Sequence, residues 1–457
     1  MANSRAVQSE NKMGVHSVGK LLASMSVPMM ISMLFQAFYN VVDSIFVSKI
    51  SENALNAVSL AFPLQNLMIA VGVGTVVGMN ALLSRSLGEK NQEKVDRAAN
   101  TTIFLTICNF VVFALIGIFL SKPFFQVQID IPEIIEYGTQ YATICLGCSF
   151  GIFSQICFER ILQSTGKTSL SMCTQLIGAI INIILDPILI FGLIGFPKMG
   201  VAGAAVATVA GQTVAAIIAI ILNIKFNKEV HLSFKLIRFH KETAKEIYKV
   251  GFPSIIMQSI GSVMTFGLNK ILLQFTETAT AVFGAYFKLQ SFIFMPVFGL
   301  NNGMVPIVAY NFGAKKPERV KATIKLAVIT AVIIMSFGTL AAEIIPGTLL
   351  SLFNASENML SIGVPALRII GSHFALAGFC IVAGSVCQAI GNPMHSMIVS
   401  ICRQLLVLLP VAFLLSLTKN LNAVWFAFPI AEVVSLTLSS IFLKITMKNA
   451  NAKMSQK

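Results

Sequence analysis

The chain has 457 residues, of which 56% are hydrophobic and only 11% are charged, and its mean hydropathy is +0.81. Soluble globular chains carry roughly 25% charged residues because their surface must be wetted, so this composition excludes a water-soluble globular protein. The formal net charge of +14 at pH 7 would suit a nucleic-acid partner, but the placement of the basic residues along the chain argues against one.

Twelve apolar segments follow one another, and each is long enough to cross roughly 30 Å of hydrocarbon as an α-helix. They cover residues 21–49, 56–84, 98–121, 134–158, 168–194, 199–224, 246–276, 280–311, 322–345, 359–390, 394–417 and 421–446. A transmembrane β-barrel would show alternating segments of about 10 residues instead. The first twenty residues are polar and the first apolar segment is too long for a signal peptide, so we expect it to stay in the mature protein. The sequence predicts an all-α polytopic membrane protein with 12 transmembrane helices.

Lysine and arginine residues are distributed very unevenly between the two sides of the predicted membrane. The connections on one side, together with both termini, hold 25 of the 33 basic residues, whereas the connections on the other side hold four. Basic residues accumulate on the cytoplasmic side of membrane proteins. We therefore expect a multi-pass protein of the cell (inner or plasma) membrane with both termini in the cytoplasm, and we interpret the positive charge as a topology signal.

The two halves of the chain repeat each other at a constant offset of 225 residues. The matches include Gln65 with Gln290, Gly74 with Gly299, Gly78 with Gly303, and Gly88 with Gly313. Each half has six spans, an even number, so the halves are parallel repeats related by an axis along the membrane normal. We expect a cytoplasmic N-terminus at 1–20, six-helix bundles at 21–224 and 246–446, a cytoplasmic linker at 225–245 and a cytoplasmic tail at 447–457. A cavity between the halves would then open to alternate sides as they rock.

Polar and acidic side chains inside the spans are the candidates for a functional site, because such residues are costly in a bilayer. Those of the first half share helix faces through spacings of three, four and seven residues. They are Gln36, Tyr39, Asn40 and Asp43 in the first span, Gln175, Asn182 and Asp186 in the fifth, and Gln155, Glu159 and Arg160 near the end of the fourth. Two buried carboxylates in one pocket cannot both be charged cheaply, so a proton, a sodium ion or a cationic substrate would balance them.

Asp186 is followed by Pro187, which removes a backbone hydrogen bond and leaves the carbonyl of Ile183 without its usual donor. This carbonyl, the Asn182 amide and the Asp186 carboxylate form a plausible cation site, although a simple proline kink with Asp186 bonded to a neighbouring helix is the alternative. Glu159 and Arg160 are either part of the site or an ion pair at the membrane edge. The remaining charges within spans are expected to be interhelical pairs or to lie near span ends; they are Lys270, Lys288, Glu343, Arg368, Arg403 and Glu432.

Several segments resemble the multidrug and toxic compound extrusion (MATE) transporters, most closely the MepA-like branch. FYNVVDSIFVSKISENALNAVSLAFP (38–63) resembles their first-span signature, and NIILDPILIFG (182–192) with GVAGAAVATVAGQ (200–212) resembles their fifth- and sixth-span signature. FERILQSTGKT (158–168) and SVCQAIGNP (385–393) resemble equivalent loops of the two halves. The resemblance covers essentially the whole chain.

The resemblance implies a V-shaped pair of six-helix bundles that exports amphipathic, often cationic compounds in exchange for H⁺ or Na⁺. It implies that the coupling cation is bound by Asp43, Asn182, Asp186 and Thr208. The implied substrate-binding residues are Gln36, Tyr39, Asn40, Gln65, Gln155, Glu159 and Gln175. Relatives of the NorM type carry carboxylates in spans 7 and 10, whereas the seventh span here reads GFPSIIMQSIGSVMTFG, so the coupling site is expected in the N-terminal half.

The sequence thus predicts a monomeric antiporter that contributes to antibiotic resistance and requires the bilayer, small-molecule drugs and a coupling ion (H⁺ favoured over Na⁺) but no other cofactor. A lipid-linked oligosaccharide flippase of the same superfamily is the alternative, although it would want a basic cavity for its phosphates. A major-facilitator carrier would show a GxxxDRxGRR-like loop after span two, where this chain reads SRSLGEKNQEKVDRA. A membrane-embedded enzyme would need a convergent His, Ser or metal constellation, and we find none in the sequence.

Overall fold

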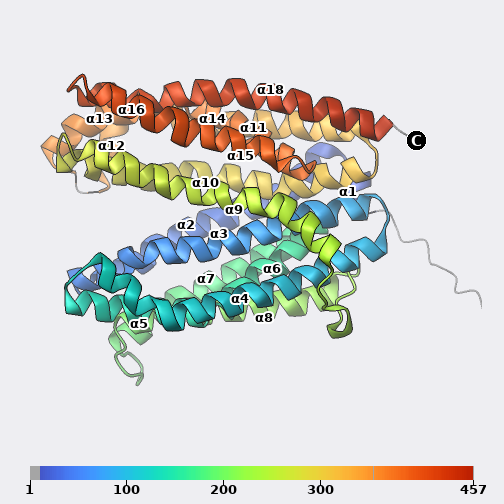
Figure 1. Ribbon diagram of the computed structural model, residues 1–457, viewed down its shortest axis with the longest axis horizontal. Helices are drawn as coiled ribbons and strands as arrows, with labels where there is room; N and C mark the ends of the chain where they lie inside the picture. Colours follow the sequence, from blue (N-terminus) through green and yellow to red (C-terminus); the bar gives the residue numbers. More distant parts are fainter. Residues whose placement is uncertain (1–10, 354, 456–457) are drawn as a thin grey trace, which may run out of the picture.

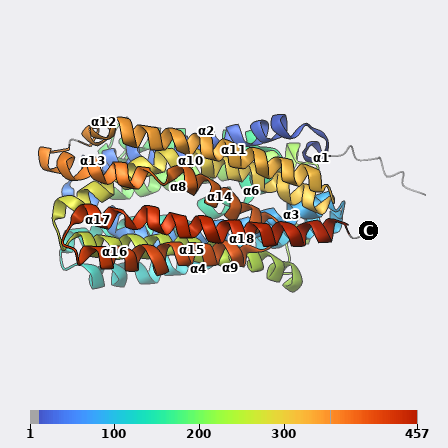
Figure 2. The same ribbon diagram turned by 90° about the horizontal axis from the view of Figure 1, so that it is seen from above.

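The computed structural model describes residues 11–353 and 355–455, and this part of the chain is helical with no β-strand. The first half contains α1 (Lys12–Val15), α2 (Val18–Ser48), α3 (Glu52–Gly88), α4 (Gln92–Gln128), α5 (Pro132–Gly147), α6 (Phe150–Ser164), α7 (Thr168–Phe191) and α8 (Val201–Phe226). A 3₁₀ turn (Phe234–Leu236) lies in the connection to α9. The long helices run along the longest axis of the molecule, as Figures 1 and 2 show.

The second half contains α9 (Lys241–Leu272), α10 (Glu277–Gly313), α11 (Pro317–Ile344), α12 (Pro346–Ser351), α13 (Glu357–Gly371), α14 (Phe374–Ala389), α15 (Pro393–Ile401), a π-helical segment (Cys402–Leu408), α16 (Leu409–Ser416), α17 (Leu421–Trp425) and α18 (Ala427–Ser455). In the described residues ten helical stretches are long and apolar enough to cross a membrane alone, and two bent pairs raise the number to twelve. The predicted fold class is therefore confirmed.

The two bent pairs are a feature that apolar segment lengths did not predict. Helices α5 and α6 meet at 43°, and α13 and α14 meet at 48°, where we expected the single spans 134–158 and 359–390. The breaks lie at residues 148–149 and 372–373, so both halves bend at nearly equivalent positions of the repeat. Because α6 continues to Ser164, Glu159 and Arg160 lie within a helix. The expectation of an ion pair at the membrane edge is wrong.

Local sequence signals begin the second long helix of each half in the same way. The Ser51 hydroxyl accepts a hydrogen bond from the backbone N–H of Ala54, and Thr276, 225 residues later, accepts one from Thr278. Such N-caps satisfy otherwise unpaired N–H groups at the start of a helix. An acidic residue follows each cap and interacts favourably with the positive end of the helix dipole.

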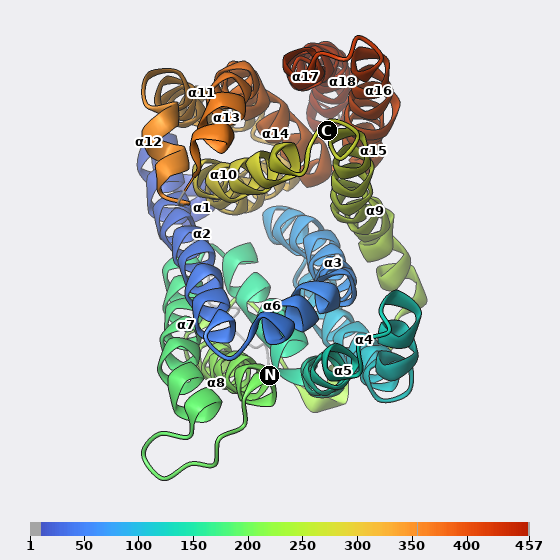
Figure 3. The ribbon, with the colours of Figure 1, turned by 90° about the vertical axis from the view of Figure 1, so that its left-hand side faces the viewer.

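The two bundles contact each other at one end through α2 with α10 and α3 with α9, and Figure 3 shows them as two separate groups of helices. Glycines make this approach close: a Cβ added at Gly78 would lie 2.0 Å from the carbonyl oxygen of Ile247, and one at Gly303 would lie 2.5 Å from the Ser26 hydroxyl. At Gly88 and Gly313 an added Cβ would meet a backbone carbonyl oxygen of the other bundle at 2.0 and 2.1 Å. These glycines are the pairs that match in the 225-residue repeat, so the contact is pseudosymmetric.

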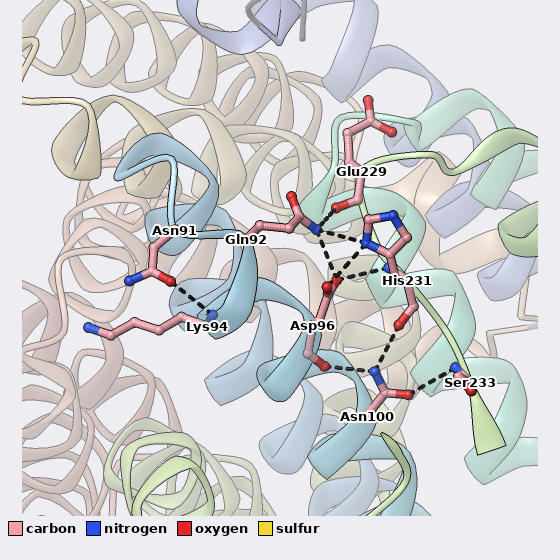
Figure 4. A network of polar contacts seen from close by, with 8 residues as sticks. All are labelled: Asn91, Gln92, Lys94, Asp96, Asn100, Glu229, His231 and Ser233. Atoms are coloured by element: carbon pink, nitrogen blue, oxygen red, sulfur yellow. Dashed lines mark hydrogen bonds and ion pairs between the residues drawn. The ribbon is translucent and has the colours of Figure 1, made fainter. Parts of the chain in front are cut away.

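The segment between the bundles is bound to the start of α4 by a network of hydrogen bonds (Figure 4). Gln92 donates to the Asp96 carboxylate and to the backbone carbonyl of Glu229, each at 2.9 Å. The backbone N–H of His231 donates to the same carboxylate at 2.8 Å, and Asn100 donates to the carbonyl of His231 at 3.0 Å. The connection therefore packs on the N-terminal bundle, at the end where α1 and the chain's C-terminus also lie (Figure 1).

A second set of charges at this end holds α1 in place. The Lys167 ammonium pairs with the Glu229 carboxylate, and the Asn11 amide donates to the other carboxylate oxygen at 3.4 Å. Burial lowers the pKa of the Lys12 ammonium, the nearby Lys167 lowers it further, and Glu229 opposes both. The N-terminal segment, the α6–α7 loop and the connection between the bundles are thus joined through Glu229.

Candidate functional site

Four of the predicted residues gather inside the N-terminal bundle, where α7 packs between α2 and α8. The Asn182 amide of α7 donates to Asp186 Oδ1 at 3.4 Å and to the Thr208 hydroxyl of α8 at 3.3 Å. Asp186 is fully buried, with a relative exposure of 0%, and Asn182 has 3%. Asp43 of α2 lies close enough to interact electrostatically with Asp186. The four residues that the family resemblance assigned to the coupling cation are therefore neighbours.

The cluster holds oxygen atoms that have no hydrogen-bond partner. Asp43 Oδ1, Asn182 Oδ1 and Asp186 Oδ2 are all buried and unpaired. Within the residues that the structure describes, no lysine or arginine forms an ion pair with either carboxylate. Buried polar atoms are normally satisfied, and uncompensated buried charge is costly. The donor set of two carboxylates and one amide therefore fits a proton or a hard cation such as Na⁺, which prefers oxygen ligands.

The remaining residues of the first span divide between the cluster and the bundle surface. Tyr39 is half-buried beside Asp43 and interacts electrostatically with both carboxylates of the cluster. Gln36 and Asn40 are exposed on α2. Gln65 of α3 donates to the Tyr141 hydroxyl at 3.3 Å, and this tyrosine interacts electrostatically with Asp43.

Tyr141 was absent from the sequence-based candidates. It lies in an apolar stretch of α5, and no spacing pattern links that stretch to the first span. A tyrosine inside a predicted span was the only available signal.

Glu159 forms a separate hydrogen-bonded cluster with two of the predicted substrate residues. Its carboxylate accepts bonds from Gln155 at 3.0 Å, Thr174 at 2.9 Å and Gln175 at 2.8 Å, and the side chain is buried. Gln175 precedes Asn182 by seven residues, which is about 10 Å along α7. Glu159 therefore lies two helical turns from the acidic cluster and joins α6 to α7.

We expect Glu159→Leu to lower the free energy of unfolding by about 3 kcal/mol, because three donors would be left without an acceptor in a buried site. Glu159→Gln keeps one acceptor oxygen and nearly the same volume, so it should cost about 1 kcal/mol. Thermal unfolding of the purified variants in one detergent measures the difference. Equal destabilisation by both substitutions would show that the hydrogen bonds are not what Glu159 contributes.

The C-terminal bundle contains a second polar region that the sequence did not place. Arg403 of the π-helical segment donates to Glu432 of α18 at 3.3 Å, so these two charges form an interhelical pair, one of the two expected arrangements. Both line a cavity of about 550 Å³. Arg160 lines it as well and donates to Asn302 of α10 at 2.9 Å, which connects the two bundles.

Known proteins resemble the chain along almost its full length. The MatE family model matches residues 28–188 and again 253–414, and the second match begins 225 residues after the first. The multidrug export protein MepA of Staphylococcus haemolyticus is 28% identical over 435 residues, which cover 95% of this chain and 94% of that protein. The probable multidrug resistance protein YoeA of Bacillus subtilis is 27% identical over 429 residues and 92% of each chain. An FAD transporter of Shewanella oneidensis is 25% identical over 422 residues, 91% of this chain and 92% of that one.

Solved structures share the same arrangement of helices. An outward-facing multidrug resistance MATE family transporter has a TM-score of 0.90 at 25% identity and covers 98% of this chain and 100% of its own. A MOP superfamily transporter from Pyrococcus furiosus, whose binding pocket has reverse polarity, has a TM-score of 0.91 at 25% identity, with 98% and 99% covered. Because the family model matches most of the chain in two repeats, this multi-pass membrane protein belongs to the MatE family, the multidrug and toxic compound extrusion transporters, in its MepA-like branch.

Proposed function

We propose that the protein is a secondary active exporter that moves amphipathic, often cationic compounds out of the cell in exchange for H⁺, with Na⁺ as the alternative coupling ion. The observation that carries this proposal is the cluster of Asp43, Asn182 and Asp186 with its three unpaired buried oxygen atoms. An acidic, buried site of this kind attracts either a coupling cation or a cationic drug. The relatives named as multidrug exporters supply the class of substrate.

The contact between the bundles supports an alternating-access mechanism. The end at which they touch carries the connection at 227–240 and the chain's C-terminus, and most basic residues belong to that side of the membrane. Under the positive-inside rule this end is cytoplasmic, so the structure corresponds to a state open to the outside. We propose that a monomer with both termini in the cytoplasm alternates between this state and one open to the cytoplasm.

The acidic cluster would couple the two steps. In the outward-open state Asp43 and Asp186 take up the cation, which neutralises the site, repacks α2 against α7 and releases the drug. In the inward-open state the cation leaves, and the restored negative charge attracts the next cationic drug. Drug and ion then compete through a shared free energy, so each lowers the affinity for the other.

Dye efflux from proteoliposomes tests the proposal. Wild-type protein should export ethidium when an H⁺ gradient is imposed, and an imposed Na⁺ gradient should drive it only if Na⁺ is the coupling ion. FAD and a polyprenyl pyrophosphate lipid serve as anionic comparisons, because one relative is an FAD transporter and the superfamily includes lipid flippases. Movement of an anion but of no cation by folded protein would reject cation export and favour the flippase alternative.

A further inference from the structure

The cavity of about 550 Å³ in the C-terminal bundle has the size of a small-molecule site. Its walls combine aromatic side chains, among them Tyr286, Phe287 and Phe428, with a few polar groups. Helices α10, α14 and α18 and the π-helical segment surround it. Aromatic walls with a few convergent polar groups are the usual composition of a ligand pocket.

The charged pair in this cavity is incompletely bonded. Arg403 and Glu432 share one contact of 3.3 Å, and the guanidinium has further donors to offer. The Glu432 side chain is only 3% exposed, and its Oε1 has no partner, whereas the Arg403 side chain is 28% exposed to the cavity. His373, which also lines the cavity, has an unpaired buried Nδ1. The pair therefore presents both a free acceptor and free donors to a ligand.

The balance of charge separates this cavity from the acidic cluster of the other bundle. Arg403 is balanced by Glu432, and Arg160 at the cavity's edge follows Glu159 directly and interacts with it electrostatically. A ligand with a single charge would face one member of the Arg403–Glu432 pair with like charge in a site of low dielectric constant. A ligand that carries both charges can bond each member without repulsion.

We propose that this cavity binds zwitterionic aromatic compounds, with the ligand's anionic group on Arg403, its ammonium group on Glu432 and its ring among the aromatic walls. This assignment rests on the proposed drug export and names a substrate class for it. The acidic cluster of Asp43 and Asp186 would then serve coupling, while the C-terminal bundle recognises this class of cargo. The π-helical segment that carries Arg403 is a form often found at functional sites.

Three forms of one molecule provide the test. Norfloxacin carries a carboxylate and a piperazine ammonium at neutral pH, its ethyl ester carries only the ammonium, and its N-acetyl derivative carries only the carboxylate. Equilibrium dialysis against purified protein, read by quinolone fluorescence, should show the zwitterion binding about tenfold or more tightly than either derivative, because each charged hydrogen bond contributes that much. Equal binding of either derivative would overturn the assignment.

Two variants link the preference to the charged pair. Arg403→Gln alone would leave Glu432 as an uncompensated buried charge, so the double variant Arg403→Gln/Glu432→Gln, which removes both charges together, is the safer test of a folded protein. It should bind all three compounds within about threefold of one another, whereas Arg368→Gln, an exposed arginine on α13 of the same bundle, should keep the tenfold preference. A zwitterion preference that survives in the double variant would overturn the proposal.

Binding by Asp43→Asn separates this proposal from the proposed export. The variant should keep the zwitterion preference even though it loses gradient-driven transport. Retained binding with no export by wild-type protein would reject the exporter alone, whereas export without a zwitterion preference would reject the pocket assignment alone.

Discussion

Asp43→Asn should reduce gradient-driven efflux of a cationic dye by about 100-fold while the protein still folds. The substitution keeps the shape of the side chain but removes the charge that exchanges between proton and drug, so the coupling free energy between the two is lost. Because Asp43 Oδ1 has no hydrogen-bond partner and the carboxylate makes no ion pair within the described residues, its loss leaves no buried charge unpaired. Efflux from proteoliposomes under an imposed H⁺ gradient measures the effect.

The matched variants are Asp186→Asn and Asp130→Asn. Asp186 belongs to the same cluster, so its amide variant should show the same loss. Asp130 lies exposed in the loop between α4 and α5, and its variant should transport at the wild-type rate. Export by Asp43→Asn at the normal rate along an ion gradient would reject the coupling mechanism.

The sequence predicted the features that depend on patterns within one helix or on a fixed offset. Span lengths follow from the apolar content of each segment, and the spacing of Tyr39 and Asp43 places both on one helix face. The constant 225-residue offset predicted two related bundles, and the family model's double match confirms the repeat. The neighbourhood of Asp43 and Asp186 came from the family resemblance, because spacing alone does not tell which helices pack together.

The features that were missed depend on contacts between distant segments. Apolar content is the same on both sides of a bend, so hydropathy did not reveal the breaks between α5 and α6 or between α13 and α14. Arg403 and Glu432 are separated by 29 residues and lie on different helices, and nothing in their local sequence indicates a shared cavity. Glu159 was a candidate for substrate binding, but its three bonds come from side chains whose direction depends on how α6 packs against α7.

The glycines of the repeat lead to the second large expected effect. Gly78→Ala and Gly88→Ala would each place a methyl group 2.0 Å from a backbone carbonyl oxygen of the other bundle, and neither backbone can move aside without shifting its helix. Such overpacking costs about 1–3 kcal/mol. The cost falls only on the state in which the bundles touch at this end, so the equilibrium should shift by about 5- to 150-fold toward the state that is open there.

Spin labels at Lys94 and Lys321, exposed residues near this end of the two bundles, report the shift as a longer distance in a background whose eight cysteines have been replaced. Dye efflux should fall in parallel, because a transporter held in one state cannot complete its cycle. Gly284→Ala on α10 is the matched control, since an added Cβ there meets nothing within 4 Å and alanine favours the helix. If Gly78→Ala and Gly88→Ala gave the same distances and efflux as Gly284→Ala, the close contact of the bundles would not control access to the site, and the two sides would have to be separated by another part of the structure.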